Sequence, residues 1–118
     1  MINKFIFDVD GTLTESRRVI DPKFKKWFMS FQKKHDTYLL TGSDRLKTIE
    51  QIGEEVYNLA KRVYNCSGNS VWEQDVNIYN NDWKLEVYPH NWLQDKLRYH
   101  HFQPKTGWHF DDRPGLCN

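Results

Sequence analysis

Two carboxylates near the N-terminus, Asp8 and Asp10, are the residues of this chain best suited to chemistry. They follow a short apolar run over residues 5–7, and Gly11 comes directly after them, where the chain can turn away. Because residues i and i+2 of a strand point to the same side, this spacing brings both acids into one site. Two carboxylates so close repel each other unless a cation neutralises them or one of them holds a proton. The pair suits phosphate chemistry, in which one acid attacks phosphorus, the other handles the proton and a hard divalent cation absorbs charge. The alternative is an ordinary strand end with two solvated acids before a glycine turn.

A second polar group, Thr41, Gly42 and Ser43, follows the apolar run over residues 38–40, and Asp44 comes next. A hydroxyl at a strand end, followed by glycine and a helix N-terminus, suits a phosphate, because the N–H groups there are unpaired and the helix dipole favours an anion. The same residues also form a common turn and helix cap. Both interpretations stay open at this stage.

The elements that must position these groups alternate along the chain. The patterns predict strands over residues 4–8, 38–40 and 62–64. Asp21 and Asp44 can each cap a helix, the first with apolar positions 24, 27, 28 and 31, the second with 49, 52, 56 and 59. Alternating strands and helices predict a parallel α/β sheet, in which the strand ends at Asp8, Thr41 and Ser67 share one rim.

The pattern changes after residue 69. Short strands are expected over residues 71–72 and 76–79, a short helix near residues 89–97 and a further strand over residues 108–112, followed by a turn at Pro114. Asp111 and Asp112 belong to this last strand, and we do not assign them to a metal.

The composition bounds the rest. With 118 residues the chain is one domain, and 17 basic against 16 acidic residues leave a net charge of +1. We therefore expect no nucleic-acid partner and no membrane partner. Cys66 and Cys117 form no metal or redox spacing, so a reduced cytoplasmic setting is expected.

Residues 5–14, which read F-I-F-D-V-D-G-T-L-T, resemble the first motif of the haloacid dehalogenase (HAD) phosphotransferases. The resemblance implies a Rossmann-like HAD core with a parallel sheet, plus the beginning of an α+β cap. It makes Asp8 the nucleophile that becomes an aspartyl phosphate, makes Asp10 the general acid and base, and assigns both to Mg²⁺. It also makes Thr41, with Gly42 and Ser43, the group that binds the transferring phosphoryl oxygen.

The resemblance narrows to eukaryotic-type phosphomannomutases. Residues 8–20 are similar to the opening of that family, with Arg17 at its arginine, and residues 67–69 are similar to its stretch after the third strand. Residues 107–118 resemble its first cap strand, which implies that Arg113 contacts the sugar phosphate. Residues 1–88 would then be the core and 89–118 the start of the cap. On residue type alone, Arg17 and Arg113 could equally be surface arginines.

We therefore expect a magnesium-dependent phosphomannomutase that interconverts mannose 6-phosphate and mannose 1-phosphate and feeds GDP-mannose synthesis. The resemblance covers only the front part of that family, without the lysine of its third motif or the acids of its fourth. The chain should thus be incomplete, a poor catalyst, and inclined to form a homodimer through an exposed apolar sheet edge. The alternatives are a HAD sugar-phosphate phosphatase and a non-catalytic, truncated HAD domain.

Overall fold

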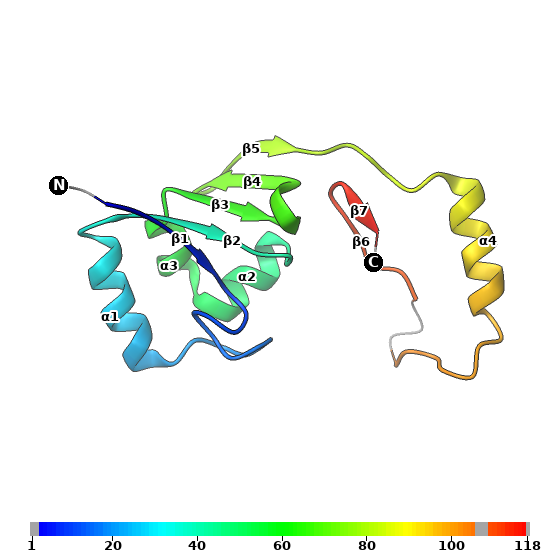
Figure 1. The fold of residues 1–118 in the computed structure, drawn as a ribbon, viewed down its shortest axis with the longest axis horizontal. Helices are drawn as coiled ribbons and strands as arrows, with labels where there is room; N and C mark the ends of the chain where they lie inside the picture. Colours follow the sequence, from blue (N-terminus) through cyan, green and yellow to red (C-terminus); the bar gives the residue numbers. More distant parts are fainter. Residues whose placement is uncertain (1–2, 106–108, 118) are drawn as a thin grey trace.

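The computed structural model describes residues 3–105 and 109–117. Its elements follow the chain in the order β1 (Lys4–Asp8), α1 (Pro22–Gln32), β2 (Asp36–Leu40), α2 (Arg45–Ile52), α3 (Glu54–Leu59), β3 (Arg62–Asn65), the 3₁₀ turn η1 (Cys66–Gly68), β4 (Ser70–Glu73), β5 (Val76–Asn80), α4 (Val87–Leu97), β6 (Asp112–Arg113) and β7 (Leu116–Cys117). The sheet-bearing part and α4 lie at opposite ends of an elongated molecule, with the β6–β7 hairpin between them (Figure 1).

The main sheet has five strands in the order β1-β2-β3-β4-β5. The pairs β1–β2 and β2–β3 are parallel, which confirms the predicted α/β core. The last two pairings, β3–β4 and β4–β5, are antiparallel, so the sheet is mixed rather than wholly parallel. The antiparallel part is the hairpin predicted over residues 71–79, and its short connection needs no crossover helix.

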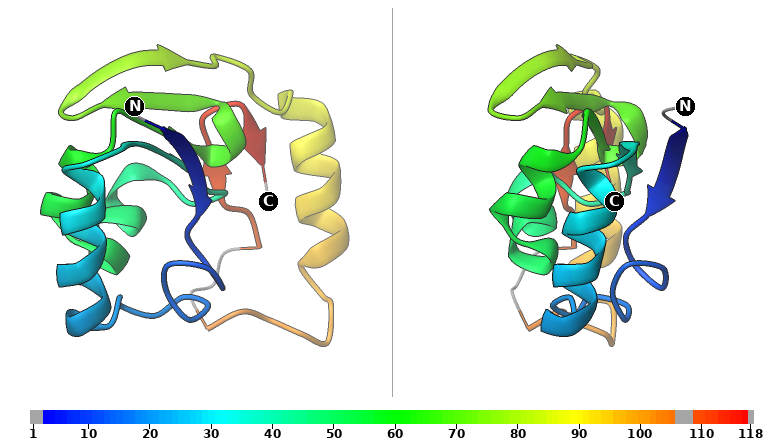
Figure 2. Two further views of the ribbon diagram at one scale, coloured as in Figure 1. Left: turned by 60° about the vertical axis from the view of Figure 1, so that its left-hand side comes forward. Right: turned by 90° about the vertical axis from the view of Figure 1, so that its left-hand side faces the viewer.

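Helices α1, α2 and α3 lie on one side of the sheet (Figure 2). Their apolar faces meet the strands in one core, whose fully buried members include Phe28 of α1, Ile52 of α2 and Leu39 of β2. Asp21 caps α1, because its carboxylate accepts a hydrogen bond of 2.9 Å from the Phe24 N–H, and Pro22 occupies the first helical position. The predicted start of this helix is confirmed.

One predicted helix is two in the structure. The periodic apolar positions between residues 49 and 59 suggest a single element, but Gly53 separates α2 from α3. Gly53 has φ 84° and ψ 154°, a combination essentially restricted to glycine. The prediction was wrong here because spacing records which side is apolar, whereas the break depends on one residue's backbone angles.

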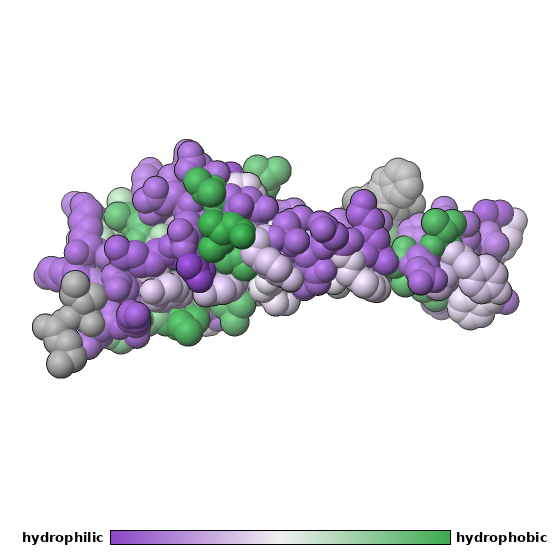
Figure 3. All heavy atoms as spheres, turned by 90° about the horizontal axis from the view of Figure 1, so that it is seen from above, coloured by the Kyte–Doolittle hydropathy of each residue, from purple (hydrophilic) through white to green (hydrophobic). Residues whose placement is uncertain are grey.

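The opposite face of the sheet carries exposed apolar side chains. Ile6 of β1 is 72% exposed and Leu40 of β2 is 45% exposed, and Tyr38 and Tyr64 line the same surface. Parallel strands usually have both faces covered, so exposure of this kind is unusual. On the face seen from above in Figure 3, hydrophilic residues cover most of the visible surface, with hydrophobic groups scattered among them.

The C-terminal part differs from prediction in one element. The helix expected near residues 89–97 is present as α4, which begins at Val87. The strand expected over residues 108–112 is wrong in extent: of its described residues, 109–112, only Asp112 is in a strand, and Asp112 and Arg113 pair with Cys117 and Leu116 across the predicted turn. A two-residue ladder is set by that turn rather than by the apolar run before it. Residues 107, 108 and 118, part of the motif expected over 107–118, lie outside the described residues.

Candidate active site

The carboxyl ends of the parallel strands meet at one rim, as the topology requires. Asp8, the last residue of β1, is paired in register with Leu40, the last residue of β2, so Asp8 lies beside the start of the loop at Thr41. Asp8 is exposed. The rim thus presents an accessible carboxylate next to the second polar group.

Asp10 is held by two hydrogen bonds to the same oxygen. Its Oδ1 accepts 2.7 Å bonds from the backbone N–H of Arg17 and from the side-chain amide of Gln51. Both donors favour the ionised carboxylate, so Arg17 first and Gln51 second hold the pKa of Asp10 below its usual value. Asp10 is therefore a carboxylate near neutral pH, in the form that accepts a proton.

Arg17 reaches Asp10 through an unusual backbone conformation. Its φ is 59°, in the left-handed region that residues other than glycine rarely adopt. A local strain of about 1–3 kcal/mol persists only where the surroundings hold it, and the bond from the Arg17 N–H to Asp10 is one such restraint. Strain of this kind is typical of functional loops.

The loop from Thr41 to Asp44 is tightly organised. Thr41 is buried, and its Oγ1 accepts a 3.2 Å hydrogen bond from the Ser43 N–H. Asp44 caps α2, accepting a 2.8 Å bond from the Lys47 N–H. The turn and the helix cap are both present, and they lie at the rim where a phosphate-binding loop is expected; phosphate binding by this segment stays a prediction.

A buried residue that sequence reasoning missed supports this loop. Asn65 at the end of β3 is fully buried and accepts a 2.7 Å hydrogen bond from the Tyr57 hydroxyl. Its side-chain N–H groups donate to the Ser43 carbonyl at 3.1 Å and to Thr48 Oγ1 at 2.9 Å. Burial raises the pKa of Tyr57, so this hydroxyl keeps its proton and donates. Asn65 therefore ties the loop and α2 to the sheet.

An open pocket of about 660 Å³ brings most of the predicted site together. It is lined by Asp10, Arg17, Gly42, Ser43, Asp44, Lys47, Gln51, Asp111 and Arg113. Three cationic and three acidic side chains face the same space. Asp8 and Thr41 are not among the lining residues, although Asp8 is exposed at the adjoining rim.

Lys47 and Gln51 also line this pocket, and neither belongs to a motif recognised in the sequence. Gln51 is 2% exposed, although it is polar, and it lies on the same buried helical face as Thr48 and Ile52. One signal in the sequence could have pointed to Gln51. It follows Thr48 by three positions and precedes Ile52, so a helix places all three on one side.

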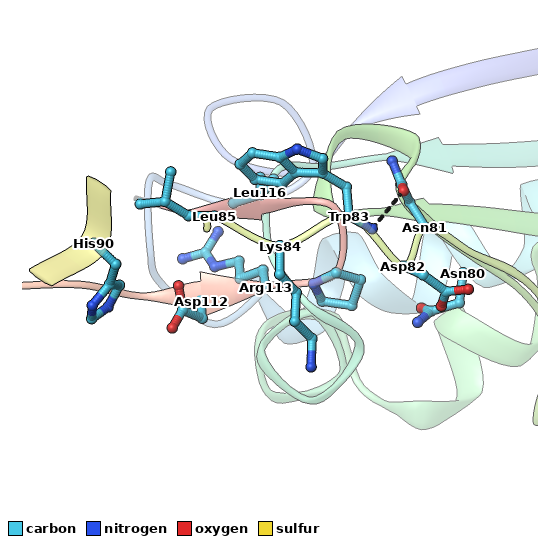
Figure 4. A pocket seen from close by; sticks show the side chains of 11 residues that line it. Asn80, Asn81, Asp82, Trp83, Lys84, Leu85, His90, Asp112, Arg113 and Leu116 are labelled. Carbon is cyan, nitrogen blue, oxygen red and sulfur yellow. Dashed lines mark hydrogen bonds between the residues drawn. The ribbon is translucent and has the colours of Figure 1, made fainter. Parts of the chain in front are cut away.

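Arg113 comes from the distant β6 and is already engaged. Its Nη1 donates to the Gly42 carbonyl at 2.7 Å, and its Nε and Nη2 donate to Asp111 Oδ2 at 3.0 and 2.6 Å. The guanidinium thereby links the hairpin to the loop after β2. Arg113 also lines a second pocket of about 780 Å³, to which Trp83 and Lys84 come from the segment after β5 and Asp112 from the hairpin (Figure 4).

The hairpin turn meets the core at a second point. Gly115 has φ 70°, and a side chain there would overlap the side chains of Asn69 and Asn81. Asn81 donates a 3.0 Å hydrogen bond to Asn69 Oδ1. The close approach of the backbone explains glycine at this turn.

The donors available to Mg²⁺ are the Asp8 and Asp10 carboxylates and the Asp10 carbonyl. They are oxygens, as this cation prefers, and they are too few to enclose it. Within residues 3–105 and 109–117, no group of three or more His, Cys, Asp or Glu residues is placed to hold a metal. The residues fit the cation in kind, and water and phosphate oxygens would have to complete its coordination.

Solved structures share this architecture. A haloacid dehalogenase-like hydrolase from Bacteroides thetaiotaomicron matches with a TM-score of 0.60 and 18% identity, over 84% of this chain and 39% of that one. A HAD subclass IIB sugar phosphatase matches with a TM-score of 0.56 and 20% identity, over 81% of this chain and 38% of that one. The chain has the haloacid dehalogenase fold.

Curated relatives are phosphomannomutases. Phosphomannomutase 1 of Dictyostelium discoideum is 43% identical over 53 residues, which are 45% of this chain and 21% of the relative. The phosphomannomutase of Glycine max is 36% identical over 63 residues, 53% of this chain and 26% of the relative. No family model matches the chain. This HAD-fold chain is thus phosphomannomutase-like over about half its length, and it spans about a fifth to a quarter of these relatives.

Proposed function

We propose that the chain carries the phosphoryl-transfer site of a HAD phosphotransferase of phosphomannomutase type. The observation that supports this most is the pocket in which the Asp10 carboxylate meets Arg17 and Ser43, next to the exposed Asp8. A nucleophilic carboxylate, a second carboxylate and phosphate-binding cations are the groups that aspartyl-phosphate chemistry requires.

In this proposal the cycle starts with a phosphoryl group on Asp8 and with Asp10 as a carboxylate. Asp10 takes the proton from the incoming sugar hydroxyl, which attacks phosphorus as the bond from phosphorus to the Asp8 oxygen breaks. In the second half, the freed Asp8 carboxylate attacks the other phosphoryl group of the bound sugar, the bond from phosphorus to the sugar oxygen breaks, and Asp10 gives its proton to that leaving oxygen. Asp8 is then phosphorylated again and Asp10 is again a carboxylate, so the atoms balance over the two steps.

The proposed substrate is mannose 6-phosphate or mannose 1-phosphate, interconverted for GDP-mannose synthesis. The sequence similarity to phosphomannomutases supports this choice. Thr41, Gly42 and Ser43 would bind the transferring phosphoryl group, and Arg17 and Arg113 the sugar phosphate. Arg113 uses three of its five N–H groups on Asp111 and Gly42, so it would bind phosphate with the remaining ones or by releasing Asp111.

Asp8 and Asp10 would hold Mg²⁺, which supplies charge neutralisation at the phosphoryl group when bound. We place the reaction in the cytoplasm, since both cysteines are free. None of the described helices is long and apolar enough to cross a membrane. We assign residues 1–88 to the core and 89–118 to the start of a cap, in keeping with the position of α4 away from the sheet (Figure 1).

A phosphatase is the second candidate, favoured by the similarity in fold to a HAD sugar phosphatase. Water would then replace the incoming sugar hydroxyl, and the same residues would serve. The third candidate is a non-catalytic domain.

Two assays in parallel separate these candidates. With Mg²⁺ and a hexose bisphosphate as phosphate donor, we expect mannose 1-phosphate to become mannose 6-phosphate without net release of phosphate. Asp8→Asn should abolish the conversion, while Asp75→Asn, in an exposed turn, should leave it unchanged. Free phosphate without an isomerised sugar would favour the phosphatase. If the wild-type chain formed neither mannose 6-phosphate nor free phosphate, the non-catalytic domain would be favoured.

We also propose that two copies of the chain associate through the open sheet face. The exposure of Ile6 and Leu40 supports this, because burying apolar surface of this kind is favourable at about 25 cal/mol per Å². Apart from this second copy of the chain, the partners that we propose are the sugar phosphates.

A further inference from the structure

Gln51, in the last turn of α2, contacts the motif loop at two points. Its side-chain Nε2 donates to Asp10 Oδ1 at 2.7 Å. Its backbone carbonyl accepts a 2.8 Å hydrogen bond from the N–H of Ile20. One residue of α2 therefore holds both ends of the loop that starts at the second carboxylate.

The side-chain contact is well defined. Gln51 is 2% exposed, so water does not compete freely for its amide. The atom facing Asp10 must be the nitrogen, since a carboxylate only accepts and the amide oxygen cannot donate. A charge-assisted bond of this length is among the stronger hydrogen bonds in proteins.

The contact decides which oxygen of Asp10 is available. Oδ1 already accepts from Arg17 and from Gln51, and in the described part of the chain no hydrogen bond to Oδ2 occurs. Two donors converging on Oδ1 fix the plane of the carboxylate. Oδ2 is then the oxygen of Asp10 left without a donor, and Asp10 lines the pocket together with Arg17 and Gln51.

We infer that Gln51 is a positioning residue for phosphoryl transfer: its amide holds Asp10 so that Oδ2 exchanges the proton with the substrate oxygen. The inference rests on the proposed function for its chemical consequence. The orientation of the carboxylate, in contrast, stands on the hydrogen bonds alone. Gln51 does not touch the reacting atoms, and its effect passes through Asp10.

Gln51→Met is the test, because it keeps the length of the side chain and the backbone bond to Ile20 and removes only the amide. Gln32→Met is the matched control. Gln32 is also a buried helical glutamine, 5% exposed. Its Nε2 donates to Thr37 Oγ1 at 3.2 Å and to the Val56 carbonyl at 3.1 Å, and it does not line the pocket that contains Asp10. Both variants should lose similar stability.

The first readout is turnover. We expect Gln51→Met to lower kcat about 10- to 100-fold with KM within about twofold, because misplacing a catalytic group by an ångström has effects of this order. Gln32→Met should keep its kcat. An equal loss of kcat in both variants, or a Gln51→Met enzyme with unchanged kcat, would overturn the inference.

The second readout does not need activity. In ¹³C and ¹⁵N NMR spectra, Gln51→Met should shift the Asp10 side-chain carboxyl carbon and the Arg17 amide and should speed hydrogen exchange at the Arg17 N–H. Gln32→Met should leave these signals in place. If the wild-type chain shows no phosphoryl transfer, the proposed function fails, and these spectra still decide the positioning role: unshifted Asp10 and Arg17 signals in Gln51→Met refute it.

Discussion

The buried hydrogen-bond network around Asn65 allows a sharp test of what holds the loop after β2. Asn65→Asp keeps the size of the side chain and replaces its two N–H donors by an oxygen. The bond from the Tyr57 hydroxyl survives, since either side chain accepts it. The Ser43 carbonyl and Thr48 Oγ1 instead face an acceptor, and the Thr48 hydroxyl proton is already donated to the Asp44 carbonyl at 2.7 Å.

The magnitude follows from these partners. A buried polar group that loses its partner costs about 1–3 kcal/mol. The Ser43 carbonyl keeps a 3.0 Å hydrogen bond from the Cys66 N–H, so losing the bond from Asn65 should cost this carbonyl an amount near the low end of that range. We expect Asn65→Asp to lower the free energy of unfolding by about 3 kcal/mol at pH 7, a large share of the roughly 5–15 kcal/mol of a typical domain.

The loss should depend on pH in a stated direction. Facing two acceptors in a buried site, the new carboxyl has a folded-state pKa above its unfolded value of about 3.9. Its protonated form can donate to one acceptor, so below about pH 4 the loss should fall to about half, and it should grow as pH rises above that value.

Urea unfolding followed by circular dichroism at pH 7 and at pH 4 measures both values by linear extrapolation. Asn91→Asp, on the exposed surface of α4, is the control and should stay within about 0.5 kcal/mol of wild type. An Asn65→Asp loss as small as that of the control at pH 7, or a gap that widens on acidification, would refute the reasoning.

Three further predictions test other parts of the molecule. Cys66 is fully buried, and burial raises the pKa of its thiol. A thiol reagent should therefore modify Cys117 alone in the native protein and both cysteines in denaturant, and the absorbance of the released chromophore counts the modified thiols. Gly53→Ala should lower the free energy of unfolding by about 2 kcal/mol in urea titrations, because alanine is strained at φ 84° and its Cβ would displace Lys25; a change under about 0.5 kcal/mol would contradict the reported backbone. Ile6→Lys should shift sedimentation toward the monomer if the open sheet face self-associates, and an unchanged distribution would contradict that interface.

Much of the fold was predictable from local sequence because its signals are local. Asp21 with Pro22 starts α1, Asp44 starts α2, and the apolar runs become parallel strands. The split at Gly53 was not predictable from periodicity, since both halves keep their apolar side toward the same core. The two-residue β6–β7 ladder was overestimated because short pairings depend on the partner and the turn.

The residues of the candidate site likewise fall into those that local sequence predicted and those that it did not. Asp8 and Asp10 were recognisable from their i, i+2 spacing after an apolar run, although β1 ends at Asp8 and Asp10 lies in the loop that follows it. Residues far from these motifs in the chain were not recognisable, because a motif does not indicate which other segment packs against it in the folded protein. Only the folded chain brings the amide of Gln51 within 2.7 Å of Asp10, across 41 positions, and the Arg113 guanidinium within 2.7 Å of the Gly42 carbonyl, across 71.

The sequence by itself thus predicted the proposed chemistry, from an aspartate pair at a strand end and a hydroxyl loop at the next strand end, and it indicated a haloacid dehalogenase-like order of elements. The tertiary structure decided the environment in which that chemistry would act. It selected Oδ1 of Asp10 as the restrained oxygen, tied the loop after β2 to Asn65, and left one face of the sheet open. The physical reason is that residue spacing along a strand or helix sets direction locally, whereas hydrogen-bond partners and burial depend on contacts between segments far apart in the chain.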